Sequence, residues 1–468
     1  MLEGAKPAIE PPILFHPEQF PGFQGRRLKA AVVLASLWLS TLGLHLWVWG
    51  HWFIYGCTVC IGLHLARLLF VTPVAAPAAL PTARDLPPGI GDRPSREGWP
   101  HVSILVAAKN ERAVIERLVA SLTQLDYPSQ SFDLWMIDDH STDGTAELLD
   151  RAAARYPNVH VVHRSDQATG GKSGALNEVW PRTQGSVLVV FDADAQVPPD
   201  LLRRVVPWFH QAQVGAVQVR KAIANADLNF WTRGQMAEMA FDAYCQQQRV
   251  FGAGIGELRG NGQFVRREAL LACGGWNEAT ITDDLDLTFR LHLTGWSIPV
   301  VVFPAVQEEG VTQFKSLWHQ RNRWAEGGYQ RYLDYWRLFT PNRLGIVKTL
   351  DLGFFWLIQY ALPTMAVPDL ALALVRSRPP VWTPLSSLVT VFLMIGMVNG
   401  LRATQKESWP LTILNTLRGV VYMVHWIVVM ATVTLRMAIR PKRLRWIKTD
   451  HQGLETEPGW LDLESVPE

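Results

Sequence analysis

The sequence predicts an α/β domain with a parallel sheet, placed between membrane-spanning helices at both ends of the chain. Short apolar runs alternate with amphipathic stretches over residues 101–310, and this alternation favours parallel strands joined by right-handed crossovers. Longer apolar runs occupy residues 30–72 and 346–437, and ~20 such residues suffice to cross a bilayer. The length of 468 residues accommodates two or three units of this kind.

The N-terminal region predicts a hairpin of two membrane spans. Residues 1–29 are polar and end in a basic cluster, and apolar spans follow at Ala30–Trp49 and Trp52–Phe70 with a tight turn at Gly50-His51. Because basic flanks stay on the cytoplasmic side, we expect residues 1–29 and the domain after the hairpin to be cytoplasmic. Residues 73–100 are rich in Pro, Ala and Gly and are expected to be a linker.

The central region predicts alternating strands and helices. Apolar runs bounded by turn residues predict strands at Val102–Ala108, Leu134–Ile137, Val159–Val162, Val187–Phe191 and Val214–Val219. Amphipathic periodicity predicts helices at Ala113–Gln124, Asp143–Ala154, Asn229–Val250, Thr282–Leu293 and Phe314–Trp336. Two of these helices, 229–250 and 314–336, are rich in aromatic residues. Such helices next to membrane spans often lie along the membrane surface, and we place residues 311–345 there; a core-facing helix is the alternative.

The C-terminal region holds three apolar stretches. They lie at about Leu350–Val375, Ser387–Asn399 and Leu411–Leu435, and the first contains two prolines. Residues 438–468 begin with a basic cluster, which we expect to be a cytoplasmic tail. An even number of spans is therefore expected in 346–437, with one stretch re-entrant or the first split in two. The protein is predicted to be an integral multi-pass protein of the cell or thylakoid membrane.

The overall composition excludes several classes of function. The formal net charge is +2, too small a basic excess to indicate nucleic-acid binding. Cys57 and Cys60 form a C-x-x-C pair, but it lies in an apolar run without a second pair, so neither zinc binding nor redox chemistry is indicated.

Two acids follow the most apolar strand, and they are the strongest functional signal. Asp192 and Asp194 come directly after Val187–Phe191, at the strand end where open α/β sheets bind their ligands. Carboxylates at such a site suit a hard divalent cation that also holds phosphate oxygens. The alternative is a helix cap, since Asp194 or Asp200 could cap the following helix.

Four further motifs carry polar chemistry. Asp138-Asp139 ends the second strand, where an acid can accept hydrogen bonds from a base or ribose. The glycine-rich turn at 170–177 places Lys172 where it could meet a diphosphate, although the spacing is not that of a P-loop. Thr282-Asp283-Asp284 opens a helix, where acids also favour the helix dipole. Gln320–Trp324 offers Arg321 and Arg323 for a pyrophosphate and an indole for a sugar.

The ordered set of these motifs resembles membrane-embedded family 2 glycosyltransferases, which include cellulose and hyaluronan synthases. The resemblance covers about Val102–Trp336 and implies a GT-A fold, a Rossmann-like glycosyltransferase domain that uses a UDP-sugar and inverts the anomeric carbon. It implies a general base at Asp284, an acceptor contact at Trp324, metal ligands at Asp192 and Asp194, and donor contacts at Ala107, Glu111, Asp139, Lys172, Asp192, Arg321 and Arg323. The family usually has Glu before the base, and this chain has Asp283.

A narrower resemblance concerns residues Gln320–Trp336, which are similar to the corresponding segment of cyanobacterial-type monoglucosyldiacylglycerol synthases. It implies transfer of glucose from UDP-glucose to the sn-3 hydroxyl of diacylglycerol in the bilayer, with Mg²⁺ or Mn²⁺ as cofactor. A processive polysaccharide synthase is the main alternative, although the few C-terminal spans favour it less. An inactive membrane scaffold or a transporter is a further alternative, but it would leave the acid and arginine motifs without a purpose.

Overall fold

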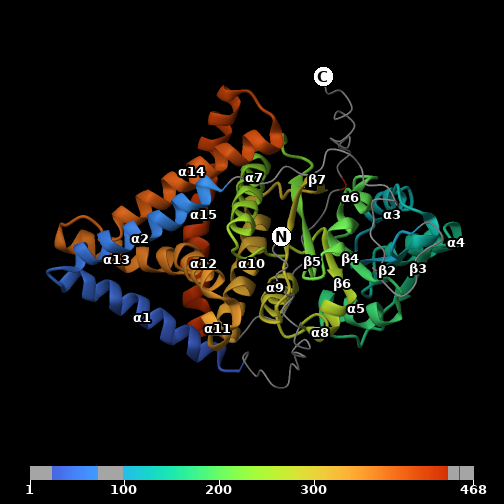
Figure 1. The fold of residues 1–468 in the computed structure, drawn as a ribbon, viewed down its shortest axis with the longest axis horizontal. Helices are drawn as coiled ribbons and strands as arrows, with labels where there is room; N and C mark the ends of the chain where they lie inside the picture. Colours follow the sequence, from blue (N-terminus) through green and yellow to red (C-terminus); the bar gives the residue numbers. More distant parts are fainter. Residues whose placement is uncertain (1–23, 72–97, 441–452, 454–468) are drawn as a thin grey trace, which may run out of the picture.

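The computed structural model describes residues 24–71 and 98–440, together with Gly453. Figure 1 shows a sheet with its covering helices on one side and a group of long helices on the other. Helices α7 (Phe230–Phe251), α9 (Asp283–Leu293) and α10 (Phe314–Tyr335) lie between the two halves. Most of the N-terminal segment, the linker and the C-terminal tail expected from the sequence lie outside the described residues.

One seven-stranded sheet forms the centre of the α/β half. Its strands are β1 (Val102–Ala108), β2 (Phe132–Asp138), β3 (Val159–His163), β4 (Val187–Phe191), β5 (Ala216–Ile223), β6 (Gln263–Arg266) and β7 (Val300–Glu308), in the order β3-β2-β1-β4-β6-β5-β7. Shorter helices flank the sheet: α3 (Ile115–Thr123), α4 (Thr145–Arg155), α5 (Gly171–Val179), α6 (Leu201–Val205) and α8 (Arg267–Ala272). The interior is apolar on both faces, as buried sheets of this class require.

The sheet confirms the α/β class, but its strands are not all parallel as predicted. β1, β2, β3 and β4 are parallel, as predicted, whereas β6 runs antiparallel to both β4 and β5. The sheet is therefore mixed. The sequence did not reveal β6, because its four residues include Gln263 and Arg266 and give no apolar run. It did not reveal β7 because Pro304 interrupts that strand.

The two N-terminal helices are α1 (Arg26–Leu46) and α2 (Gly50–Phe70), and both are long and apolar enough to cross a membrane. Each begins earlier than the hydropathy predicts, and the turn lies at residues 47–49 rather than at Gly50-His51. Gly50 starts α2 because its backbone approaches the end of α1 closely. An ideal Cβ there would lie 2.2 Å from the carbonyl oxygen of Leu44.

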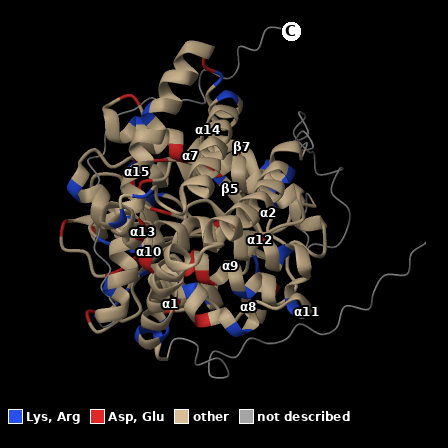
Figure 2. Ribbon diagram, turned by 90° about the vertical axis from the view of Figure 1, so that its left-hand side faces the viewer, with Lys and Arg blue, Asp and Glu red and all other residues tan. Residues whose placement is uncertain are grey.

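The C-terminal helices differ from the apolar stretches expected from the sequence. Short α11 (Pro341–Leu344) precedes α12 (Ile346–Trp356), a π turn at Leu357–Ala361, α13 (Leu362–Arg376), α14 (Thr383–Gln405) and α15 (Trp409–Ile439). Among the described residues, three C-terminal helices are long and apolar enough to span: Ile346–Arg376, Thr383–Gln405 and Trp409–Ile439. They qualify by length and composition alone, so the expectation of an even number of spans stays a prediction. In Figure 2 the ribbons of this group are mostly free of charged residues.

Two physical reasons explain the difference. The first apolar stretch is not split at Pro363, because the wider π turn directly before the proline accommodates the missing hydrogen bond and the helix continues. The second stretch looked too short because Ser387–Asn399 is only its apolar centre. The helix extends to 23 residues through polar residues at both ends.

The aromatic-rich helix α10 packs inside the protein rather than along its surface. From Ala325 to Tyr335 nearly every side chain is buried, and Tyr329 and Tyr332 belong to a core shared with α15. The core-facing alternative therefore describes this half of the helix. Phe314 and Trp336 at its two ends are exposed.

Buried ion pairs join the α/β half to the membrane helices. Asp351 of α12 accepts a hydrogen bond from Arg249 Nε of α7 at 2.9 Å, and it also accepts one from the backbone N–H of Ile255. The side chains of Arg249 and Asp351 are 3% and 1% exposed, so neither charge has water to stabilise it. Each charge is therefore stabilised mainly by its ion pair with the other.

We predict that Asp351→Ala destabilises the protein by up to about 3–5 kcal/mol, because the substitution removes the close partner of the buried Arg249 charge and leaves only its longer ion pair with Glu257 at 3.6 Å. The measurement is urea unfolding in detergent micelles. Asp150→Ala is the matched control: the Asp150 side chain is 65% exposed, and its ion pair with His163 should contribute about 0–1 kcal/mol. Equal losses in the two variants would contradict the prediction.

Candidate active site

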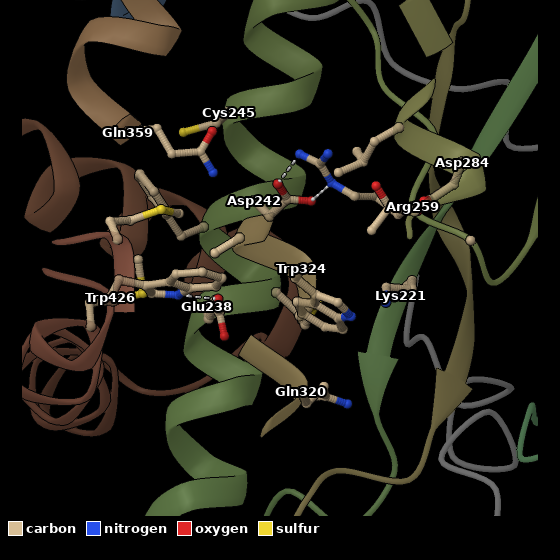
Figure 3. Close-up of a pocket in the computed structure, with 18 of the residues that line it drawn as sticks. Lys221, Glu238, Asp242, Cys245, Arg259, Asp284, Gln320, Trp324, Gln359 and Trp426 are labelled. Carbon is tan, nitrogen blue, oxygen red and sulfur yellow. Dashed lines mark hydrogen bonds and ion pairs between the residues drawn. The ribbon is translucent and has the colours of Figure 1, made fainter. Parts of the chain in front are cut away.

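A cavity of about 690 Å³ runs from the ends of the sheet strands into the group of membrane helices. Its polar arm is lined by β-strand ends and the starts of helices, including Lys172, Asp192 and Asp284. Its apolar arm is lined by residues of the C-terminal helices, including Ile358, Val389 and Ile427. Figure 3 shows Asp284, Lys221 and Trp324 on the side of the sheet, and Gln359, Cys245 and Trp426 on the side of the helices.

The strand order explains how distant acids come together. β2, β1 and β4 are parallel neighbours, so their carboxyl ends meet at one edge of the sheet. Asp139 follows β2, Ala107 lies at the end of β1, and Asp192 follows β4. The predicted residues that line the cavity are Ala107, Glu111, Asp139, Lys172, Asp192, Asp194, Asp284, Arg323 and Trp324.

The glycine-rich turn delivers Lys172 to the acids of β4. Lys172 lies in the first turn of α5, and its Nζ donates to Asp192 Oδ1 at 2.5 Å. Burial alone would lower the pKa of Lys172, but the carboxylates of Asp192 and Asp283 outweigh it and raise that pKa. The lysine is therefore a fixed positive charge in the polar arm. Asp139, also in this arm, accepts a hydrogen bond from Arg164.

Asp192 and Asp194 fit a hard divalent cation that shares its coordination with a ligand. Asp194 is 6% exposed, and its Oδ2 accepts a hydrogen bond from the backbone N–H of Glu309 at 3.0 Å. Asp192 already faces the ammonium of Lys172. No group of three or more His, Cys, Asp or Glu side chains gathers for a metal among the described residues. This set suits Mg²⁺, which binds one or two carboxylates and takes its other oxygens from water and phosphates.

Asp284 lies in the first turn of α9, and its environment suits a proton acceptor. Burial, followed by the neighbouring Asp283 carboxylate, raises the pKa of Asp284 to about 6. A base of this pKa is ionised at neutral pH and still binds a proton readily. Thr282 is the N-cap residue of α9, but its side chain makes no capping hydrogen bond.

Glycines of α10 allow the start of α9 to approach closely. An ideal Cβ on Gly327 would lie 2.3 Å from Thr282 Oγ1, and one on Gly328 would lie 2.1 Å from the hydroxyl of Tyr360. Both distances are too short for a real carbon atom, so any larger residue would displace Thr282 or the Tyr360 side chain. The Gly-Gly pair thereby lets Thr282, two residues before Asp284, pack directly against α10.

The two arginines of the Gln320–Trp324 motif have different surroundings. Arg323 lines the polar arm; burial lowers its pKa, while the charges of Asp192 and Asp284 act in the opposite direction. Arg321 is fully buried outside the cavity, where its Nη2 donates to Glu238 Oε2 at 2.6 Å and to the Tyr422 hydroxyl. The structure therefore places Arg321 away from the cavity that the other predicted donor residues line, and its contact with the donor diphosphate stays an untested prediction. Residues two apart in a helix point about 160° to 200° away from each other.

Trp324 lines the cavity, but cations lie over its ring. The Arg321 guanidinium carbon is 4.1 Å from the ring centroid and Lys221 Nζ is 5.0 Å from it. Its indole is thus engaged in cation–π contacts within the protein.

Sequence reasoning missed several polar residues of the same cavity. Lys221, near the end of β5, pairs with Glu308 at 3.1 Å, and Glu309 follows at the end of β7. The apolar residues before Glu308 were the available signal for a strand ending in acids, but Pro304 interrupts them. Lys221 gave no comparable signal, since the predicted strand stopped two residues before it.

This geometry is that of a glycosyltransferase domain, and comparisons with known proteins agree. Residues 100–327 match the model of the family described as glycosyltransferase like family 2. The mannosyltransferase PcManGT from Pyrobaculum calidifontis, solved in complex with GDP-Man and Mn²⁺, superposes with a TM-score of 0.53. The comparison covers 85% of this chain and 99% of that one at 21% identity, and it shows a shared GT-A type of fold.

Two full-length relatives define the family. The beta-monoglucosyldiacylglycerol synthase of Nostoc sp. is 55% identical over 437 residues, which cover 92% of this chain and 90% of that protein. The synthase of the same name from Synechocystis sp. is 54% identical over 450 residues, covering 95% and 92%. The chain belongs to the family of beta-monoglucosyldiacylglycerol synthases, glycosyltransferases of glycolipid synthesis.

We predict that Arg323→Met weakens donor binding while Arg321→Met destabilises the fold. Loss of one hydrogen-bonding cation should raise KM for the donor about tenfold or more. Loss of Arg321 leaves Glu238 buried without its ion pair and should cost about 3–5 kcal/mol of stability. The two variants form a matched pair, measured by donor KM and by urea unfolding. A raised KM with unchanged stability in Arg321→Met would restore its predicted role at the donor.

Proposed function

We propose that the protein transfers glucose from UDP-glucose to the sn-3 hydroxyl of 1,2-diacylglycerol, with inversion at the anomeric carbon, to give β-monoglucosyldiacylglycerol. The names of the relatives support a lipid acceptor and a glucosyl product. The observation that carries the proposal is the continuity of the cavity: one space joins the acids and cations of the sheet edge to an apolar chamber among helices long enough to span a membrane.

In the proposed reaction the donor binds in the polar arm. Asp139, Glu111 and the backbone near Ala107 lie at the far strand ends and would meet the uridine. Lys172 and Arg323 face the opposite part of that arm and would meet the diphosphate, where fixed positive charge stabilises the departing UDP. Positioned charge of this kind is usually the largest contribution to catalysis.

Asp284 acts on the acceptor. Its carboxylate takes the proton from the sn-3 hydroxyl as that oxygen forms a bond to C1 of glucose and the bond from C1 to the UDP oxygen breaks. Attack from the face opposite the leaving group inverts the anomeric carbon. Trp324, held by Lys221 and Arg321, forms a wall beside the glycerol. Asp192 and Asp194 would hold Mg²⁺, or Mn²⁺ in its place, which supplies positive charge to the diphosphate.

The processive synthase is less well supported. A translocated sugar chain needs polar and aromatic side chains along its path. The part of the cavity among the helices has some of these, such as Gln359 and Trp426, but aliphatic residues such as Leu362, Val389 and Ile427 also line it. A stacking platform for a growing chain also needs a free indole face, and cations already lie over Trp324. We further propose that the α/β half lies on the cytoplasmic side, where nucleotide sugars are found and where the basic flanks belong.

The direct test is a product assay. Purified protein in mixed micelles receives UDP-[¹⁴C]glucose or UDP-[¹⁴C]galactose together with diacylglycerol, and the products are separated by thin-layer chromatography. One lipid-soluble monoglucoside with β linkage by NMR is the expected product. An immobile labelled polymer would select the processive synthase, a galactolipid would correct the donor, and no product would contradict the proposal.

We predict that Asp284→Asn lowers kcat by about 10²–10⁴-fold while UDP binding stays close to that of the wild type, because an amide cannot accept the acceptor proton. The measurements are initial rates and calorimetric binding of UDP. Asp150→Asn, far from the cavity, is the control. A variant that keeps more than about a tenth of wild-type kcat would contradict the assignment.

The pH dependence of the wild type tests the same residue. Asp284 acts as a base only when ionised, so kcat should fall as the pH decreases through about 6. The charge of Lys221 lowers the pKa of Asp284, so Lys221→Met should move this acid limb to higher pH.

We predict that chelation with EDTA abolishes transfer and that Mg²⁺ or Mn²⁺ restores it. Asp194→Ala should raise the metal concentration needed for half-maximal activity, since one of its carboxylate ligands is lost. Asp200→Ala, an acid in the same loop that pairs with Arg204, is the control. Full activity in chelator would show that the acids serve another purpose.

A further inference from the structure

The apolar arm of the cavity has no role in the chemistry described so far. Its lining includes residues from α2 and from three C-terminal parts of the membrane region: Leu65 from α2, Ile358 and Leu362 from the π turn and α13, Val389 and Phe392 from α14, and Ile427 from α15. Much of its wall is protected, since Leu362 is only 7% exposed and Val389 packs against the core between α2, α13 and α14. Ile427 is 48% exposed, so the wall at α15 also reaches the outside of the helix group. The arm is therefore an apolar chamber that continues into the polar arm.

The α14 wall of the arm offers little hydrogen bonding. Thr390 contributes a hydroxyl, but its Oγ1 donates to the backbone oxygen of Ser386 at 2.8 Å within its own helix. The other lining residues of α14 are Ser386, Val389, Phe392 and Leu393. On the opposite side Gln359 also lines the cavity, and its Oε1 has no hydrogen-bond partner. An occupant rich in hydroxyl groups would leave most of them unpaired against these walls, which is unfavourable. Hydrocarbon meets no such penalty.

The connection to the polar arm identifies the occupant further. The chamber and Asp284 line the same cavity, so one molecule can reach both. That molecule must carry a hydroxyl at one end, for the base, and a flexible hydrocarbon chain at the other. An acyl chain of the acceptor lipid has this form.

We propose that the apolar arm is an acyl-chain site: one fatty acyl chain of the acceptor lipid leaves the bilayer and lies between α13, α14 and α15 while its hydroxyl lies at Asp284. This rests on the proposed transfer to a lipid. It adds that the enzyme discriminates between acyl chains, because side chains of the arm, and not only the bilayer, contact the chain. Residues that line the arm then determine acyl-chain specificity.

The test compares two valines of the same helix. Val389 lines the arm, whereas Val391, two residues further along, is 52% exposed on the outer face of α14. Val389→Phe and Val391→Phe therefore add the same side chain inside and outside the chamber. Each variant is assayed with diacylglycerols of C8, C12, C16 and C18 chains at a fixed mole fraction in mixed micelles. The quantity compared is the ratio of kcat/KM for C16 to that for C8.

Val389→Phe should lower this ratio at least about tenfold, since each methylene kept out of an apolar site costs about fourfold in affinity. Val391→Phe should leave the ratio unchanged. Activity with the C8 lipid shows that the variant is folded. If Val389→Phe is inactive with every lipid, Val389→Leu is measured in its place. Equal ratios in the two variants, or an equal shift in both, would overturn the proposal.

A second measurement does not depend on turnover. A diacylglycerol with a diazirine at the end of one acyl chain is photolysed with the wild-type protein, and labelled peptides are identified by mass spectrometry. Labelling of the segments around Ile358, Leu362 and Val389 is expected. Labelling only of outward positions such as Leu374 and Val391 would place the chain in the surrounding detergent and overturn the proposal. If the wild-type enzyme glucosylates both the C8 and the C16 lipid but either test fails, the proposed function stands and the acyl-chain site is rejected.

Discussion

A single buried carboxylate, that of Glu257, orders the charged side chains at the junction between the two halves of this protein. It is fully buried, and three arginines surround it: Arg259 Nη1 at 2.8 Å, Arg331 Nη1 at 3.0 Å and Arg249 Nη1 at 3.6 Å. Burial alone would raise the pKa of Glu257, but the three guanidinium groups outweigh it and lower that pKa. The arginines come from different parts of the chain, α7, α10 and the loop before β6, so the carboxylate orders all three at once.

The charges around Glu257 balance. Asp351 accepts from Arg249, and Asp242 accepts from Arg259 at 2.7 Å, so three acids meet three arginines. A buried network of this kind adds little net stability compared with apolar packing, but an incomplete network is costly. The contribution of the network is to fix a single arrangement of the segments that carry these acids and arginines. The network lies along the cavity where the sheet meets the membrane helices, and there a small displacement would separate the acceptor hydroxyl from its base.

The local chemistry of the site could be predicted from the sequence because it depends on strand ends. Val187–Phe191 is an unbroken apolar run, and Asp192 and Asp194 follow it directly, so their place at the sheet edge follows from the strand itself. Asp139 and Asp284 were found in the same way, from a strand end and a helix start.

The sequence could not show which way each side chain of the buried helix α10 points. Arg321 and Arg323 read alike in sequence, but α10 is buried on most of its surface, so both faces of the helix need polar partners. Glu238, which pairs with Arg321, lies 83 residues earlier in the chain, and Lys221 meets Trp324 only through the tertiary fold. No local pattern records such pairs. The antiparallel β6 was missed for a related reason, since only its neighbours make it a strand.

The Gly327-Gly328 pair has a mechanical consequence. Thr282, beside the base, touches α10 at Gly327, and Tyr360, in the π turn of a membrane helix, touches it at Gly328. Two adjacent residues thus separate the helix that starts at Asp283 from the span Ile346–Arg376. Helices tilt when the hydrocarbon thickness of the bilayer changes. The side chains of Thr282 and Tyr360 both meet the backbone of α10 here, so a tilt of this span changes the contact at Gly328 unless the Tyr360 side chain adjusts.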